Sequence, residues 1–457
     1  MTSAHDVVVI GGGWAGLSAG VALAEHGFQV ALLERKPALG GRAYSFPDPD
    51  TGDFIDNGQH VLMGCYAETL KFLGRIGSRD KLFFHRNLEI EMIDRGGRHG
   101  RLRTAPVPGP FHMSTALLRY GLLSPRERLR LMTGGMRMLA MRRRDPAALE
   151  KMTVAGLMDV LGQGQRARET FWYPLSIATL NDSPEVSSSA LLAEVLKRAF
   201  FSRRGDSAFV YSRVGLSDLY CAAAADFIEN RGGVIARHTA AERLELDAQG
   251  HIARVRLRDG QSLQASNYIV AVPPPQLLRL LPDVVAADNF FSRFEGLGVS
   301  PIICAHVWLD REVTASPFVG FIGTPTQWMF NKRKIFAQHG ARHAGYLSFV
   351  ISGARDLIDR SNDDLLEMIL ADLRTMIPAA ADAHVVKALV IKEKQATMAP
   401  NLDSHHLRPP PATPVANLFL AGDWVQSELP ATIESAVASG TKAAARLMER
   451  AGLPAAA

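Results

Sequence analysis

Cysteine is scarce in this chain, and no long apolar run is present. The three cysteines, Cys65, Cys221 and Cys304, stand far apart among 457 residues. Their spacing suits neither a zinc site nor a disulfide framework, so we expect no metal and free or buried thiols in a reducing compartment. No stretch of eighteen uncharged apolar residues is present, so no membrane-spanning helix is predicted. No signal-peptide pattern is visible either, which favours the cytoplasm.

Repeats, low-complexity regions and nucleic-acid motifs are also missing. The net charge is +5, but the basic residues are not interleaved with aromatic ones, so nucleic-acid binding is not expected. The one biased segment is the proline-rich RPPPATP at 408–414. The length allows two domains with substantial cores.

The first strong motif is VVVIGGGWAGLSAGVALAEHGFQVALLE, at residues 7–34. Its apolar start predicts a buried parallel strand. Gly11, Gly13 and Gly16 then fit the G-x-G-x-x-G pattern that lets a pyrophosphate approach the start of a helix. Glu34 ends the next predicted strand, where its carboxylate can bind ribose hydroxyls. This order predicts an adenine-dinucleotide site; the alternative is a glycine-rich turn that merely packs well.

Two further segments favour FAD over NAD. Gly40, Gly41 and Arg42 follow the first motif, and FIDNGQHVL comes after them at 54–62. NAD has no evident need for a second glycine pair, whereas FAD extends beyond the pyrophosphate. Near the other end, LFLAGDWVQSELPATIESAVASG at 418–440 predicts a strand, a glycine turn and a second helix start, which is a second anion-binding terminus.

Together these motifs resemble the family of flavin amine oxidases and carotenoid-type desaturases. The resemblance implies FAD as cofactor, with Asp423 at its ribityl and phosphate region. It also implies a helix near Thr432 and Ile433 that points its positive end at the flavin N1/O2 edge. The implied cofactor-binding residues are Gly11, Gly13, Trp14, Ala15, Gly16, Glu34, Arg35, Gly41, Arg42, Gly58, Gln59, His60, Val61, Ala241, Gly422, Asp423, Thr432 and Ile433.

The expected fold class is α/β: a Rossmann-type, glutathione-reductase-like FAD-binding domain with an interleaved α+β substrate domain. Residues 1–62, 205–289 and 415–457 are assigned to the first domain, and 63–204 and 290–414 to the second. Within 231–247, RGGVIARHTAAERLELD is interpreted as one strand. IICAHVWL, YLSFVIS and HVVKALVIKEK are predicted strands of the substrate domain.

A basic segment, SPRERLRLMTGGMRMLAMRRR at 124–144, predicts a helix with a capping box formed by Ser124 and Glu127. Leu129, Met132, Met136 and Leu139 fall on one flank, and Arg126, Arg130 and Arg137 form a stripe beside them. This pattern favours peripheral contact with the inner face of the cell membrane. The alternative is a core-packed helix whose arginines face water and whose Gly134–Gly135 pair is a flexible break.

The narrower resemblance is to the hydroxysqualene dehydroxylases, the squalene-associated branch of the FAD-dependent desaturases. It depends on SPRERLRL, WYPL-x4-LND at 172–182, and the run from RPPPATP to AGDW. It implies a long-chain isoprenoid substrate: hydroxysqualene would be reduced to squalene by hydride from reduced FAD, in squalene and hopanoid biosynthesis. A carotenoid or isoprenoid desaturase or isomerase, a flavin amine oxidase and a non-catalytic lipid-carrying flavoprotein stay open. Amine oxidation is less favoured, because flavin amine oxidases often carry a lysine in the strand that corresponds to SPIICAHVWL, and this strand has none.

The leaving hydroxyl needs a proton, and the candidate donors are Asp182 and His60. Asp182 is equally compatible with a helix cap, and His60 with a packing role beside the ring. Only one dinucleotide motif is present, so we expect an external electron donor.

Overall fold

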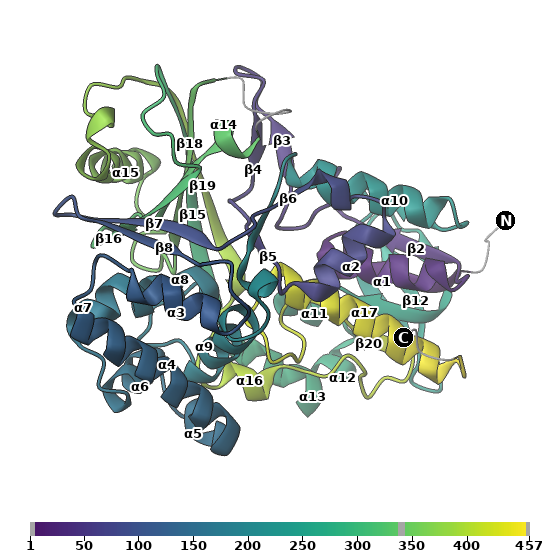
Figure 1. Cartoon of the computed structure of the whole chain (residues 1–457). Coiled ribbons are helices and arrows are strands. Elements are labelled where there is room, and N and C mark those ends of the chain that lie inside the picture. Colours follow the sequence, from purple (N-terminus) through teal and green to yellow (C-terminus); the bar gives the residue numbers. More distant parts are fainter. Residues whose placement is uncertain (1–4, 337–342, 454–457) are drawn as a thin grey trace.

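The computed structural model describes residues 5–336 and 343–453, and Figure 1 shows the fold. A five-stranded parallel sheet has the order β10-β2-β1-β14-β20. These strands are β10 (Val234–Ala236), β2 (Val30–Leu33), β1 (His5–Ile10), β14 (Ala265–Val270) and β20 (Leu418–Leu420). They come from all three segments assigned to the FAD-binding domain. The predicted Rossmann-type α/β class is confirmed.

Helix α1 (Trp14–Glu25) is apolar on all sides and almost wholly buried, as expected for a helix enclosed by other elements. It lies beside the C-terminal helix α17 (Ile433–Arg450), which Figure 1 draws in yellow. A Cβ at Gly440 of α17 would lie 2.1 Å from both the carbonyl oxygen of Ala15 and the hydroxyl oxygen of Ser18. The two ends of the chain can therefore pack this closely only with glycine at position 440.

A second, seven-stranded sheet has the order β19-β15-β18-β17-β16-β7-β8. These strands are β19 (Val385–Met398), β15 (Val299–Leu309), β18 (Gly345–Ser352), β17 (Trp328–Asn331), β16 (Phe318–Ile322), β7 (Glu89–Asp94) and β8 (His99–Arg103). The three strands predicted for this region are present as β15, β18 and β19. Side chains alternate: Ile303 and Ala305 pack against α15 (Asn362–Met376), whereas Ile302 and Cys304 face a cavity.

Three short sheets accompany the two large ones in the described part of the chain. They consist of β3 (Ser45–Pro47) with β4 (Phe54–Asp56), of β5 (Leu62–Met63), β9 (Phe209–Ser212) and β6 (Leu82–Phe84), and of β11 (Ala241–Leu246), β12 (Ile252–Leu257) and β13 (Ser262–Leu263). The single strand predicted across 231–247 is wrong. His238 has a φ of +55° and separates β10 from β11, which lie in different sheets. A periodic apolar pattern does not reveal such a left-handed residue.

Helices cover the remaining surfaces. They are α2 (Ala67–Arg75), α3 (Phe111–Leu118), α4 (Pro125–Arg144), α5 (Pro146–Glu150), α6 (Val154–Val160), α7 (Gln165–Ala167), α8 (Tyr173–Leu180), α9 (Ser189–Val195), α10 (Ala222–Glu229), α11 (Pro274–Leu280), α12 (Asp283–Ala286), α13 (Asn289–Ser292), α14 (Lys332–Ile335) and α16 (Ser404–Leu407). Within the described ranges, no helix combines the length and the apolar character needed to cross a bilayer.

The basic helix α4 begins with the predicted capping box of Ser124 and Glu127. Its Gly134–Gly135 pair is not a flexible break, because the helix continues through both glycines and both are buried. A Cβ at Gly134 would lie 2.4 Å from Nε2 of Gln163. The glycines therefore allow close packing within a continuous helix.

Candidate cofactor and substrate site

One cavity of about 790 Å³ extends from the ends of the parallel strands to the seven-stranded sheet. Its first part is lined by the glycine turn after β1, by the end of β2, by Gly40–Ala43, by the start of β11 and by the start of α17. Its second part is apolar and lies among β7, β15–β18, α3 and α8. The cavity therefore joins a polar cradle to an apolar chamber.

The glycine turn forms one wall of the cradle. Gly11 has a φ of +113°, which favours glycine. The Glu34 carboxylate holds the turn, since it accepts hydrogen bonds from the backbone N–H of Gly12 (2.9 Å) and of Lys36 (2.8 Å). A Cβ at Gly13 would meet only the Cα of Gly41, at 3.7 Å. The protein itself therefore leaves room for a side chain at position 13. Glycine is needed there only if a ligand occupies the cradle.

Trp14 supplies an observation of the same kind. Its indole ring stacks on Tyr220, with centroids 3.6 Å apart. The indole Nε1 is buried and has no hydrogen-bond acceptor among the described residues. Trp14 also opens α1, whose first-turn N–H groups have no intrahelical acceptors. An anionic or carbonyl-bearing group in the cradle would satisfy these donors, as the pyrophosphate of a dinucleotide does.

Asp423 lies on the opposite wall. Its Oδ1 is 2.7 Å from a guanidinium nitrogen of Arg42, which also donates to the carbonyl of Ala396 (2.8 Å). The buried guanidinium of Arg408 donates to four backbone carbonyls between residues 423 and 429. Burial lowers the pKa of Arg408 to about 10, so the group remains charged at neutral pH. The arginine that begins the RPPPATP segment thus holds the loop that follows Asp423.

The second helix terminus is formed as predicted. Thr432 is the N-cap of α17, and its hydroxyl accepts from the backbone N–H of Ser435. Thr432 and Ile433 both line the cavity. The Glu434 carboxylate faces away and accepts from the backbone N–H groups of Glu68 (3.0 Å) and Thr69 (2.9 Å), which are in the first turn of α2. Glu434 therefore stabilises the start of another helix.

Most of the predicted cofactor-binding residues line the cavity. Those that do are Gly11, Gly13, Trp14, Ala15, Glu34, Arg35, Gly41, Arg42, Gly58, Gln59, His60, Val61, Ala241, Gly422, Asp423, Thr432 and Ile433. Gly16 is not among the lining residues. A Cβ there would lie 1.9 Å from the carbonyl oxygen of Gly11, so Gly16 keeps the turn closed.

Asp182 does not line the cavity either. Its buried carboxylate receives two contacts from the Arg355 guanidinium, at 3.2 and 2.5 Å, and one from the backbone N–H of Ser183. The neighbouring Asn181 has a φ of +59° and accepts from Ser300 through its carbonyl. The LND segment therefore fastens the end of α8 to the seven-stranded sheet, and this geometry argues against Asp182 as a proton donor.

His60 lies where the cradle meets the apolar chamber. Its Nδ1 is 2.9 Å from the carbonyl oxygen of Gly58. A carbonyl can only accept, so the proton of the neutral ring is on Nδ1 and Nε2 carries a lone pair. Burial lowers the pKa of His60, despite the opposing charge of Asp56. The ring is therefore neutral at pH 7 and offers Nε2 to a substrate hydroxyl.

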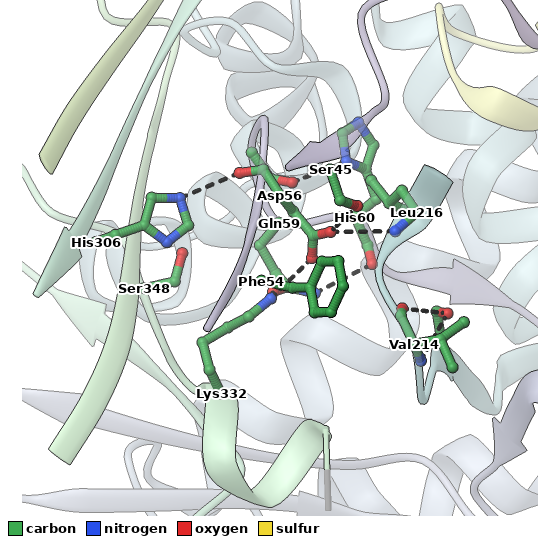
Figure 2. Close-up of polar contacts among 12 residues, drawn as sticks. Ser45, Phe54, Asp56, Gln59, His60, Val214, Leu216, His306, Lys332 and Ser348 are labelled. Atoms are coloured by element: carbon green, nitrogen blue, oxygen red, sulfur yellow. Dashed lines mark hydrogen bonds and ion pairs between the residues drawn. The ribbon is translucent and has the colours of Figure 1, made fainter. Parts of the chain in front are cut away.

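Directly behind this loop is a buried ion pair that the sequence did not indicate (Figure 2). The Lys332 ammonium, which is 0% exposed, lies 2.8 Å from Oδ2 of Asp56 and 2.7 Å from Oε1 of Gln59. Oδ1 of Asp56 accepts from the hydroxyl of Ser45 and from the backbone N–H of Leu216. Burial opposes ionisation of Asp56, but Lys332 outweighs it and holds the pKa of that carboxyl below its ordinary value.

A second group of polar contacts continues from this pair. The ring of His306, on β15, approaches the carbonyl oxygen of Asp56 at 3.1 Å through Nε2, and its Nδ1 is 2.9 Å from the hydroxyl of Tyr346. Burial lowers the pKa of His306 to about 3. The burial of Lys332 could not be predicted from the residues around it, because both of its partners, Asp56 and Gln59, are more than 270 residues away in the chain.

The residues that line the apolar chamber were not predicted from the sequence either. Its lining includes Met63, Leu88, Ile90, Met92, Leu102, Met113, Tyr120, Phe171, Pro174, Leu175, Phe200, Phe209, Tyr211, Ile302, Phe318, Trp328, Phe330, Ile335 and Val350. These side chains come from eight or more separate elements. Alternation in β15 and β18 predicts which residues share a sheet face, but not which of the two faces lines a cavity.

Comparison with known proteins agrees with this arrangement. The family described as "Flavin containing amine oxidoreductase" matches residues 14–448, so the chain belongs to that family. It is an FAD-dependent oxidoreductase, and the cradle residues described above fit FAD.

Among curated relatives, the chain is 25% identical to 15-cis-phytoene desaturase of Glycine max, over 97% of this chain and 79% of the relative. It is 24% identical to 15-cis-phytoene desaturase of Synechococcus elongatus, over 97% and 96%. It is 25% identical to hydroxysqualene dehydroxylase of Zymomonas mobilis, over 95% and 97%. The similarity thus runs through both halves of the chain.

Solved structures agree on the fold. Cyclohexylamine oxidase from Brevibacterium oxydans superposes with a TM-score of 0.72 at 16% identity, and covers 98% of this chain and 100% of that one. An oxidoreductase from Methanosarcina mazei gives a TM-score of 0.75 at 16% identity, over 97% and 99%. At this identity the likeness concerns the fold alone.

Two glycine substitutions should separate cofactor binding from folding. Gly13→Val should leave the fold intact and lose the flavin, because the protein has room for a Cβ at this position and the pyrophosphate does not. Gly16→Ala should instead lower thermal stability, because its Cβ would collide with the Gly11 carbonyl. Circular dichroism and the flavin absorbance of the purified proteins measure the two effects. A Gly13→Val protein that retains full flavin occupancy would disprove the assignment of this cradle.

Proposed function

We propose that the chain reduces hydroxysqualene to squalene with hydride from reduced FAD, as a hydroxysqualene dehydroxylase does. The observation that carries the proposal is the continuity of the FAD cradle with a long apolar chamber that has His60 at the junction. Such a chamber suits a hydrocarbon chain, and one polar ring suits a single hydroxyl. The full-length similarity to a hydroxysqualene dehydroxylase supports the same reading.

A desaturase is the second candidate function, because phytoene desaturases match the chain over a similar length and at similar identity. A desaturase would remove hydride from an isoprenoid and would need no partner for a hydroxyl. His60 lines the cavity and keeps Nε2 for a partner such as a hydroxyl, which favours the reductive reaction.

Product analysis distinguishes these functions. The purified protein, reduced with dithionite under anaerobic conditions, should convert hydroxysqualene into squalene while one flavin is reoxidised per product. Because hydrogen on reduced flavin exchanges with water, the reaction in D₂O should place one deuterium in each squalene. Mass spectrometry and flavin absorbance follow both. If the oxidised protein instead bleaches with phytoene or with a primary amine, and hydroxysqualene is returned unchanged, the proposal is wrong.

His60 is proposed as the group that meets the substrate hydroxyl: its neutral ring accepts a hydrogen bond at Nε2, and only its protonated form supplies the proton to the leaving oxygen from that atom. Since burial lowers the pKa of His60, its protonated fraction grows only as the pH falls. Turnover should therefore increase as the pH falls through about 6.5, the unperturbed histidine pKa, and should keep increasing below it. In His60→Gln this dependence should vanish and turnover should fall by roughly 10² or more.

Asp182→Asn is the matched comparison for His60→Gln. It should leave turnover near the parent value and lower the unfolding free energy by about 1–3 kcal/mol, because a charged hydrogen-bond partner of Arg355 is lost. A loss of turnover in Asp182→Asn together with an unchanged pH profile in His60→Gln would reverse the two roles.

A membrane-facing entrance is part of the proposal. Exposed apolar side chains gather on α3 and α4: Phe111 is 68% exposed, Leu118 55%, and Leu129 and Met136 61% each. α3 and α4 pack together, and Met113 of α3 lines the apolar chamber. This surface thus lies on helices that adjoin the wall of the chamber. A hydrophobic substrate can pass from lipid into such a chamber without crossing water.

The arginines of this surface suit anionic headgroups. Arg126, Arg130 and Arg137 of α4 are all exposed, as the helical spacing predicts. Arg128 donates to the carbonyls of Leu118 and Leu123, and Arg142 pairs with the buried carboxylate of Glu194. Arg143 and Arg144 are exposed as well, but they follow the exposed apolar side chains of the helix at its last turn. We therefore assign headgroup contact to the first two-thirds of α4, on the inner face of the cell membrane.

Replacing Arg126, Arg130 and Arg137 with Glu should reduce sedimentation with anionic vesicles and activity on vesicle-borne substrate. Activity in detergent should persist, and binding of the parent should weaken as salt screens the charges. The control is an equal change of charge at three other exposed arginines, Arg231, Arg360 and Arg374, which should have little effect. Equal sedimentation of both triple variants would exclude α4 as the contact.

A further inference from the structure

Five aromatic rings line one part of the chamber wall: Phe209 and Tyr211 on β9, Phe318 on β16, and Trp328 and Phe330 on β17. The ring centroids of Phe209 and Phe318 are 5.3 Å apart, those of Phe318 and Phe330 6.0 Å, and those of Trp328 and Phe330 6.4 Å. The register of the sheet pairs Phe318 with Phe330 on adjacent strands. We call these five residues the aromatic wall.

The aromatic wall begins next to His60. Strand β9 pairs with β5 so that Val210 lies opposite Leu62, which is two residues after His60. Tyr211, Phe318 and Phe330 belong to one apolar cluster that also contains Val61. A substrate whose hydroxyl reaches His60 therefore places the carbon that bears this hydroxyl beside the rings.

Carboxylates are kept away from this wall. The carboxylates among the described cavity-lining residues are Glu34, Glu242, Glu393, Asp423 and Glu434. Glu34 and Asp423 belong to the cradle, Glu242 is on β11, Glu393 lies beside Arg42, and Glu434 is bound at the start of α2. Burial raises the pKa of the Cys304 thiol, so it stays a neutral, weak nucleophile.

From this arrangement we infer that the aromatic wall stabilises positive charge on an allylic carbon as its hydroxyl leaves. The inference depends on the proposed function and narrows its substrate class to alcohols that ionise to an allylic cation. Ring faces attract cations electrostatically, and more strongly where water is excluded. Unlike a carboxylate, a ring face does not capture the carbocation as an ester.

The reaction balances with the groups available. The C–O bond breaks with its electron pair on oxygen, which takes a proton and leaves as water. The carbon, then electron-deficient, receives a hydride and forms the new C–H bond. Reduced flavin supplies these two electrons and is oxidised. The role of the wall is limited to the interval between the departure of oxygen and the arrival of hydride.

A stable cation tests the wall without turnover. Farnesyl-trimethylammonium and the neutral compound in which carbon replaces nitrogen have the same shape, so their binding to the oxidised holoprotein can be compared by calorimetry. The neutral compound is favoured by hydrophobic transfer alone. If the rings attract the charge, the ammonium compound should bind about tenfold tighter than the neutral compound, or more. Squalene should displace both compounds.

Phe318→Leu and Phe330→Leu should each remove most of this preference while the flavin spectrum is unchanged. Phe290→Leu, at a half-buried ring on α13 outside the cavity, is the control and should retain it. On hydroxysqualene, the two wall variants should lower the single-turnover rate of flavin reoxidation more than they weaken substrate binding. If a variant fails to fold, the comparison of the two compounds on the parent protein still tests the wall.

The outcomes separate the wall from the proposed function. If hydroxysqualene is converted but the neutral compound binds as tightly as the ammonium compound, the aromatic wall has no cation-stabilising role and the proposed function stands. If the ammonium preference is present in the parent and lost in the wall variants, the cation site stands even where hydroxysqualene is not the substrate.

Discussion

The buried contact between Asp56 and Lys332 sets the position of the two halves of the protein. Asp56 ends a strand that follows the glycine motifs, and Lys332 comes directly after the central strand β17 of the seven-stranded sheet. A buried ion pair tolerates little change in geometry, because leaving one charge unpaired costs about 3–5 kcal/mol. The contact with Gln59 extends this constraint to the loop that carries His60. The pair thus holds the polar ring at the junction of cradle and chamber.

The packing of α1 against α17 plays the same part for the cofactor. Each helix begins at the cradle, so the angle and distance between them determine where two positive helix ends point. Gly440 permits the contact, and Ser18 of α1 lies within hydrogen-bond distance of the carbonyl of Val437 (3.1 Å). Both ends of one extended ligand can therefore be bound although the two helices are more than 400 residues apart in the chain.

Prediction succeeded where the chemistry is local. The turn after β1, the capping box of α4 and the N-cap Thr432 each depend on residues within a few positions of one another. Where a partner is distant, the local residues alone do not define the role of a side chain. Asp182 has the acid chemistry of a proton donor, but Arg355 occupies its carboxylate. The Gly134–Gly135 pair is compatible with a flexible break until Gln163 is seen to pack against it.

The sequence alone determined the cofactor class and predicted most of the residues that line the cradle, because a dinucleotide is bound by contiguous turns and helix ends. Tertiary structure decided what the rest of the site can do. The carbonyl of Gly58 fixes the tautomer of His60, so that Nε2 carries the lone pair, and burial favours the neutral ring by lowering its pKa. The aromatic wall exists only because β9, β16 and β17 lie next to one another. The pattern of residues within one strand cannot predict a surface that is formed by strands from separate parts of the chain.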